Sequence, residues 1–357
     1  MDPSTHIIDP DGEVIIVLHN ANSPFAHAAE DMVPGRLSHG PPEPHNPISH
    51  QESIPEGAAT DDSALETQMC ESMSRREFRI QVSAKHMMFA SSFFKKTLTG
   101  GWKESETYLQ KGSVEVTADG WDPEALLIII RAIHCQYSLI PKKVTLEMLA
   151  KIAAIADYYD CKDVLHIITD IWFSSLDEKV TASSRDLVLW LWVSWVFKHP
   201  TQFTEATSTA MSWSEGFIDA RGLPIPNQAI ASMEKSRREA IENVMLYLHG
   251  TCEAFLSGDR GCGFECKSIM YGALNLQIRS SSLLSPTPAT PFPGISYKNL
   301  IQEVSSFRSP RWYESSGPFP KRGQTYRHDC SDSSFKTLFA NLNHSIEGLQ
   351  LDKLSNP

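Results

Sequence analysis

The first half of the chain contains short hydrophobic segments with the patterns of strands and of helices. Three segments have a strand pattern. The first is a β-branched run that follows an Asp-Gly turn, and the other two alternate apolar and polar residues with a period of two. The predicted strands are residues 13–18, 77–82 and 113–117. Elsewhere in this half, apolar residues recur at three- and four-residue spacing and predict helices. These helices are expected to begin after Ser83, Asp122, Thr145 and Cys161.

The helix that begins with Asp122-Pro123-Glu124 is the most hydrophobic of them. An aspartate side chain can accept hydrogen bonds from free backbone N–H groups at a helix start. Proline needs no donor there, and an acid is favourable near the positive end of the helix dipole. The residues that follow, up to Ile133, are apolar on nearly every side. We therefore expect this helix to lie deep in a core.

The segment 22–76 interrupts this pattern. It contains seven prolines and many Ser, His, Asp and Glu residues, with few apolar residues in sequence. Such a stretch buries too little apolar surface to offset the entropy that is lost when it becomes ordered. The sequence therefore predicts a disordered insertion inside one domain, not a linker between two.

The second half of the chain has a different pattern. Beyond residue 184 every periodic segment has helical spacing, and the nine residues from Ser285 to Pro293 include four prolines, which favour an extended connector. We predict an α+β domain over 1–180, with a small sheet flanked by helices, followed by an all-α C-terminal region. That region is expected to contain a helical domain over 181–284, then a proline-rich connector and helical tail over 285–357.

Charge and composition exclude several classes of function. The net charge is −11 and lysine and arginine form no cluster, so nucleic acid is not expected as a ligand. No apolar run approaches the roughly 18 residues of a membrane span, and the first residues lack the features of a secretory signal. We expect an intracellular protein, cytoplasmic or nuclear, whose seven cysteines are reduced and which does not bind a membrane.

Three local motifs resemble those of the BTB/POZ domain. The segment Asp11-Gly12-Glu13-Val14-Ile15 is similar to the first strand of that family. Residues 78–86, followed by 91–95, resemble its F-x-V-H-K…S-x-x-F core, and residues 149–159 resemble its L-L-x-x-A-D-x-Y helix. The resemblance covers residues 9–177 without the insertion. It implies a BTB/POZ fold there and self-association into a homo-oligomer.

The second half resembles BTB-domain-containing proteins of filamentous fungi, a largely uncharacterised class. The similar segments are residues 186–197, 261–266 and 309–313. Two departures from better-known BTB proteins are the long insertion after the first strand and the absence of kelch repeats or zinc fingers downstream. The resemblance therefore implies a fold and leaves the partner open.

Trp102 and Glu104 follow the helix stop at Gly100-Gly101. In BTB proteins that bind a cullin, a hydrophobic-x-Glu sequence near this point docks the ubiquitin-ligase scaffold. The resemblance implies that Trp102 is an exposed apolar plug and that Glu104 is a charged orienting contact. Aromatic residues often dominate the binding energy of interfaces. The alternative is that Trp102 packs onto its own domain and that Glu104 is merely solvated.

Four residues near the end of the chain match the chemistry of a zinc site. Cys262 and Cys266 share one face if they lie in a helix, and His328 and Cys330 could complete a Cys₃His set. Such a structural site would tie the C-terminal tail to a helix. The alternative is that these cysteines are buried reduced thiols that act as small hydrophobic residues. No other cofactor is expected.

The sequence contains no catalytic signature. It lacks a phosphate-binding loop, a dinucleotide-binding glycine motif, a zinc-protease motif and a nucleophile elbow. We therefore expect a non-enzymatic protein-interaction protein. In one version it is a ubiquitin-ligase adaptor whose C-terminal helices capture a client. In the other it is a scaffold or transcriptional co-regulator that uses the BTB domain only to oligomerise.

Overall fold

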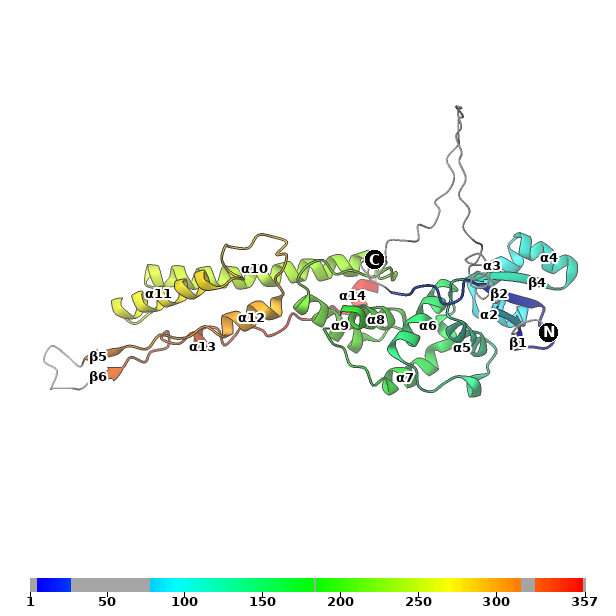
Figure 1. The fold of residues 1–357 in the computed structure, drawn as a ribbon, viewed down its shortest axis with the longest axis horizontal. Helices are drawn as coiled ribbons and strands as arrows, with labels where there is room; N and C mark the ends of the chain where they lie inside the picture. Colours follow the sequence, from blue (N-terminus) through cyan, green and yellow to red (C-terminus); the bar gives the residue numbers. More distant parts are fainter. Residues whose placement is uncertain (1–4, 27–77, 183, 316–324, 356–357) are drawn as a thin grey trace, which may run out of the picture. The chain divides into compact units, whose positions relative to one another are not determined.

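The chain divides into two compact units, unit 1 over Met1–Asp177 and unit 2 over Glu178–Pro357. The computed structural model describes residues 5–26, 78–182, 184–315 and 325–355 (Figure 1). The disordered insertion predicted over 22–76 lies outside the described residues from position 27 onward. Residues 181–284 and 285–357, which were predicted as separate parts, both belong to unit 2.

Unit 1 contains a small mixed sheet with the strand order β1-β3-β2-β4. The central pair, β2 and β3, is antiparallel, whereas β1 runs parallel to β3 and β4 runs parallel to β2. The strands are β1 (Thr5–Ile7), β2 (Val14–His19), β3 (Phe78–Val82) and β4 (Val114–Asp119). The three predicted strands are therefore confirmed. The three-residue β1 carries too short a pattern to be recognised in the sequence.

The strand register explains why one face of this sheet is buried. Val14 lies opposite both Val82 and Val114, and Ile16 lies opposite both Ile80 and Val116. These side chains are at most 6% exposed, so they form one continuous apolar layer. Side chains alternate between faces along a strand, so the period-two pattern of β4 leaves its intervening residues in solvent.

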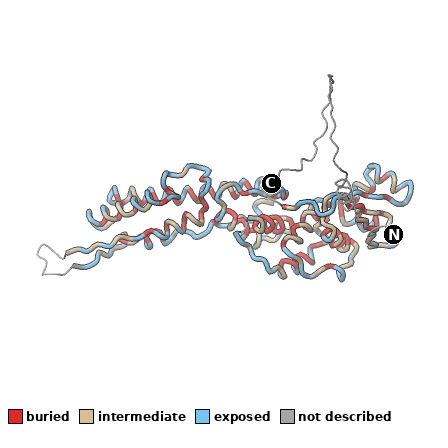
Figure 2. Tube along the Cα trace, in the orientation of Figure 1, coloured by how far each residue is buried: buried red, intermediate tan, exposed pale blue. Residues whose placement is uncertain are grey.

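The helices of unit 1 pack mainly against one another, and one of them also packs along β4. They are α2 (Ala84–Ala90), α3 (Ser92–Thr99), α4 (Lys103–Lys111), α5 (Pro123–Ile133), α6 (Leu146–Tyr158) and α7 (His166–Ser175), with short 3₁₀ turns η2 (Tyr137–Leu139) and η3 (Lys162–Leu165). The buried positions of unit 1, red in Figure 2, concentrate on α5 and α6. The prediction of a deeply buried helix after Asp122 is confirmed.

The helix starts follow local hydrogen-bond chemistry. The Asp122 carboxylate accepts from two backbone N–H groups of α5, and the Thr145 hydroxyl accepts from one of α6. Ser83 differs from expectation, because its side chain caps nothing, and the Glu13 carboxylate instead accepts from the N–H of Ala84 at 3.0 Å. The helix expected after Ser83 is also interrupted at Ser91, whose hydroxyl caps α3.

Unit 2 is built mainly from helices. They are α8 (Ser184–Val196), α9 (Pro200–Trp213), α10 (Asn227–Ser257), α11 (Phe264–Ser280), α12 (Tyr297–Ser305), α13 (Phe335–Leu338) and α14 (Leu351–Ser355). The helix α8 packs on α9, α10 packs on α11, and α12 contacts both α9 and α10. The expected all-α region also contains a short antiparallel pair, β5 (Tyr313–Ser315) and β6 (Thr325–Arg327). That expectation was therefore wrong at this hairpin, whose strands have only three residues each.

A buried arginine fixes the proline-rich connector against α10. Arg237 is 1% exposed, and its guanidinium donates to four backbone carbonyls. The acceptors and distances are Ser214 (2.9 Å), Pro291 (3.1 Å), Phe292 (2.9 Å) and Ile295 (2.7 Å). The connector is thus a folded part of unit 2. Among the described residues no helix is both long and apolar enough to span a membrane.

Unit 1 is expected to lose stability below pH 6.5 because of His134. Its Nε2 accepts from the N–H of Ser83 at 3.1 Å, so the proton sits on Nδ1, which donates to the Ile130 carbonyl at 2.8 Å. Burial lowers the pKa of His134, the Ile130 hydrogen bond opposes this effect, and nearby His86 lowers the pKa further. The unfolded chain therefore takes up a proton near pH 6.5 that the folded state resists.

Stability from this histidine is thus complete above pH 6.5 and falls as the pH decreases towards the lower pKa of the folded state. Urea unfolding between pH 5 and 8 measures the effect, with His134→Gln as the comparison because a glutamine oxygen can still accept from Ser83. We expect the variant to have a shallower dependence on pH. Equal slopes for the two proteins would show that His134 is not responsible.

Candidate metal centre

Two of the four candidate ligands lie at the turn between α10 and α11. The helix α10 ends at Gly258 in the left-handed conformation, and Cys262 lies in the short loop that follows. Gly261 also has a positive φ of 89°, and a Cβ atom there would lie 2.9 Å from the Cβ of Lys267. Glycine is therefore needed for this tight turn. Cys266 lies in the first turn of α11 and is only 2% exposed.

The other two candidate ligands follow the β5–β6 hairpin. The strands pair with Tyr313 opposite Arg327 and Glu314 opposite Tyr326. The pairing continues one residue further, because the N–H of His328 donates to the Trp312 carbonyl at 3.0 Å. His328 and Cys330 therefore leave the hairpin directly beside the α10–α11 turn.

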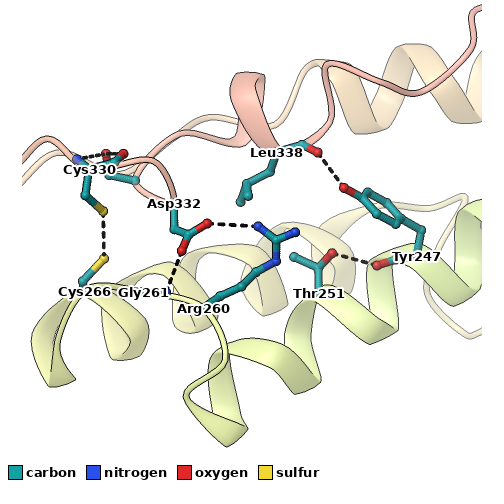
Figure 3. A network of polar contacts seen from close by, with 9 residues as sticks. Tyr247, Thr251, Arg260, Gly261, Cys266, Cys330, Asp332 and Leu338 are labelled. Atoms are coloured by element: carbon teal, nitrogen blue, oxygen red, sulfur yellow. Dashed lines mark hydrogen bonds and ion pairs between the residues drawn. The ribbon is translucent and has the colours of Figure 1, made fainter.

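The structure brings all four predicted residues together. Their ligand atoms all lie within 4.8 Å of one another. The Cys262 sulfur lies 3.4 Å from Nε2 of His328, and the Cys266 and Cys330 sulfurs lie 3.7 Å apart. Figure 3 shows the Cys266 and Cys330 side chains pointing towards each other from facing segments. This Cys₃His cluster has the donor atoms and the spacing to hold a metal ion.

Glu314 and Trp312 orient the histidine of the cluster. The Glu314 carboxylate accepts from Nδ1 of His328 at 2.7 Å, which leaves Nε2 facing the sulfurs. The indole of Trp312 stacks on the imidazole, with ring centroids 4.5 Å apart. The hydrogen bond with Cys330 raises the pKa of His328, and Glu314 raises it further. The sequence reasoning missed both residues, since only the hairpin register places them beside His328.

The thiols differ in how readily they lose a proton. Burial raises the pKa of the Cys266 thiol to about 12. At Cys330 burial also raises the pKa, but hydrogen bonds with His328 and with the backbone N–H of Asp332 outweigh it and bring the pKa down to about 7. A thiolate is the form of cysteine that binds metal ions. Cys330 is therefore the thiol best prepared to act as the first anionic ligand.

Polar contacts outside the cluster join the two segments that carry the candidate ligands, the α10–α11 turn and the segment after β6. The Asp332 carboxylate accepts from Arg260 at 3.0 Å and from the N–H of Gly261 at 2.9 Å. Further along, the Tyr247 hydroxyl donates to the Leu338 carbonyl at 2.7 Å (Figure 3). The segment after β6 is thus fixed to the α10–α11 hairpin at Asp332 and again at Leu338. The fold itself therefore holds the four candidate ligands.

Trp102 and Glu104, the predicted partner-binding residues, lie at the start of α4 in unit 1. Trp102 precedes the first residue of the helix and is 64% exposed. Glu104 lines a groove of about 540 Å³ between α4 and the strands β2 and β4. Polar residues such as Thr107 and Thr117 form most of its lining. The groove is therefore mainly polar, and the exposed Trp102 is not among the residues that line it.

Three comparisons of the chain with known proteins found no match. No protein-family model, no curated protein and no solved structure matches the chain. Its function is therefore inferred from its own residues and their geometry.

Proposed function

We propose that this chain is a non-enzymatic protein-interaction protein. In it, unit 1 is a BTB/POZ-type docking domain and unit 2 is held together by a structural zinc ion. The observation that carries the docking role is the exposure of Trp102, which is 64% accessible to solvent at the start of α4. A large aromatic residue that its own domain leaves uncovered is the kind of side chain that anchors a partner.

Zinc fits the distances in the Cys₃His cluster. At a zinc–sulfur distance of about 2.3 Å, two sulfurs at corners of a tetrahedron lie about 3.8 Å apart, and a sulfur and an imidazole nitrogen lie about 3.6 Å apart. The separation of the Cys266 and Cys330 sulfurs is 3.7 Å, and that of the Cys262 sulfur and Nε2 of His328 is 3.4 Å. Both pairs therefore match edges of a zinc tetrahedron.

The ligand set also supports a structural role for the ion. Catalytic zinc sites generally keep one position open for water or substrate, whereas structural sites use four protein ligands. Cys262, Cys266, His328 and Cys330 would fill all four positions. The ion would join the start of α11 to the segment after β6, where Cys266 and Cys330 are 64 residues apart in sequence. Such a site stabilises the fold of unit 2 and does not catalyse a reaction.

The docking role of unit 1 is tested with Trp102→Ala and Glu104→Gln against a purified cullin N-terminal domain. Removal of an interface anchor should weaken binding by about 2 kcal/mol, or roughly 30-fold. Loss of the neighbouring charge should act mainly on the association rate and its salt dependence. Neither variant should change the melting temperature, because Trp102 is largely exposed and Glu104 lies on the surface of α4.

Trp213→Ala is the matched control, since Trp213 of unit 2 is also exposed, at 42%. It should bind as the wild type does. If the wild-type chain binds no cullin, the adaptor role is excluded and self-association through unit 1 becomes the function to test. If Trp102→Ala instead lowers stability by about 3–5 kcal/mol, the tryptophan is a packing residue and not an anchor.

Glu314 is expected to determine how tightly the cluster binds zinc. Carboxylates that accept from a ligating histidine typically contribute 10- to 100-fold to metal affinity. Glu314→Ala should therefore weaken zinc binding by about that factor, while Glu314→Gln should lose less, because an amide oxygen can still accept from Nδ1. Competition with a chromophoric chelator measures the affinities.

Asp329→Asn is the control for charge alone, since Asp329 is an exposed acid beside the cluster. It should leave zinc affinity nearly unchanged. Equal losses in Asp329→Asn and Glu314→Ala would mean that general electrostatics, rather than orientation of His328, sets the affinity.

A further inference from the structure

We propose that Cys266 and Cys330 are a site of oxidative modification, where a hydroperoxide converts the zinc link into a disulfide link between the same two segments. This inference rests on the proposed zinc centre and concerns its regulation. The two cysteines come from different elements, α11 and the segment after β6. Either link would therefore connect the same parts of unit 2.

The geometry favours this pair of sulfurs. They lie 3.7 Å apart and face each other (Figure 3), so a bond of about 2.0 Å requires them to approach by less than 2 Å. The Cys262 sulfur also lies within 4.8 Å of these two sulfurs, and it is 3.4 Å from Nε2 of His328. A disulfide between Cys262 and Cys266 would moreover close a loop within a single turn and would link no separate elements.

The burial of the two thiols sets the order of events. Cys330 is partly accessible, whereas Cys266 is 2% exposed. The Cys330 thiolate attacks the outer oxygen of the hydroperoxide. The S–O bond forms, the O–O bond breaks, and the alkoxide leaves as an alcohol after taking up a proton. The product is a sulfenic acid on Cys330, directly opposite the protected sulfur of Cys266.

The second step completes the disulfide. The Cys266 sulfur attacks the sulfur of the sulfenic acid, so that the S–S bond forms and the S–O bond breaks. The hydroxide that leaves takes up a proton from the solvent and departs as water. Overall, two zinc-bound thiolates, one hydroperoxide and two protons give one disulfide, one alcohol, one water and one released zinc ion. The two thiolates supply the two electrons, and the zinc ion stays divalent.

Zinc must leave when this bond forms. Only Cys262 and His328 remain as ligands, and two ligands do not make a tetrahedral structural site. The fold of unit 2 persists, because the disulfide and the Asp332 contacts with Arg260 and Gly261 still hold the two segments together. Oxidation would thus release the metal and leave the exposed Cys262 as a free thiol, without unfolding the unit.

The test uses the full zinc-loaded chain, treated with hydrogen peroxide in the presence of a chromophoric chelator. We expect release of one zinc per chain, a mass about 2 Da below that of the reduced, metal-free chain, and a peptide that joins Cys266 to Cys330 on non-reducing digestion. The far-ultraviolet circular dichroism should be unchanged, and dithiothreitol with added zinc should restore the starting state. The Cys330→Ser variant should not form the disulfide to Cys266. The Cys252→Ser variant should behave as the wild type does, because Cys252 lies outside the cluster.

The metal content before oxidation separates the two proposals. A chain that purifies without zinc overturns the zinc centre. A chain that contains zinc but then joins Cys262 to another cysteine, or over-oxidises to sulfinic acid without a Cys266–Cys330 link, overturns the disulfide proposal alone.

Discussion

Replacement of Arg237 by methionine is expected to lower the free energy of unfolding of unit 2 by about 3–5 kcal/mol, because it leaves several buried carbonyls without donors. The guanidinium is buried and donates to four carbonyls, three of which belong to residues 291–295. Methionine fills much of the space of the arginine stem but donates no hydrogen bond. Each carbonyl that remains buried without a partner costs about 1–3 kcal/mol, partly relieved where water can enter.

Urea unfolding, followed by the fluorescence of the unit 2 tryptophans, measures this loss. Arg238→Met is the matched control, because the neighbouring arginine is exposed and should tolerate the same change. Arg237→Lys should recover only part of the stability, since one ammonium group cannot reach four acceptors. A loss below about 1 kcal/mol in Arg237→Met would show that water replaces the guanidinium easily and that the connector is loosely held.

Replacement of Cys266 by serine is expected to abolish zinc binding and to destabilise the segment around residues 308–338. Cys266 is the most buried of the cluster cysteines, and removal of its sulfur leaves three ligands. Because zinc binds only the folded state, loss of zinc binding lowers the free energy of unfolding by about 4 kcal/mol when free zinc exceeds the dissociation constant 1000-fold. Thermal unfolding with and without a strong chelator measures the difference.

Cys252→Ser is the control for the chemical change, because Cys252 is a half-buried cysteine of α10 outside the cluster. Chelation should lower the melting temperature of the wild type and of Cys252→Ser by the same amount. It should have no further effect on Cys266→Ser. If all three proteins melt alike and ignore the chelator, the cysteines of the cluster are simply packing residues.

Much of unit 1 could be predicted from the sequence, because its elements depend on local signals. The alternation around β3 and β4 and the Asp122 and Thr145 caps each act within a few residues, and the structure confirms them. Local sequence did not predict the cap of α2 correctly, because the expected cap was Ser83. Its place as the cap of α2 is taken by Glu13, which is distant in sequence and reaches Ala84 only through the fold.

The four residues of the candidate metal centre could be predicted from the sequence, but the residues that support them could not. Cysteine and histidine are uncommon residues with few roles, so the Cys262, Cys266, His328 and Cys330 set could be selected by chemistry alone. Glu314 is one of many acids, and only its place in the β5–β6 register puts it on His328. Arg237 was missed for the same reason, since its acceptors are backbone atoms that no sequence pattern marks.

X-ray absorption at the zinc edge of the purified full chain tests the central claim most directly, because it reports the metal and its ligands together. We expect one zinc per chain, with three sulfurs at about 2.3 Å and one nitrogen at about 2.0–2.1 Å. A chain that purifies without zinc, or a zinc ion surrounded only by oxygen and nitrogen, would contradict the proposal that the cluster of Cys262, Cys266, His328 and Cys330 is a structural zinc centre.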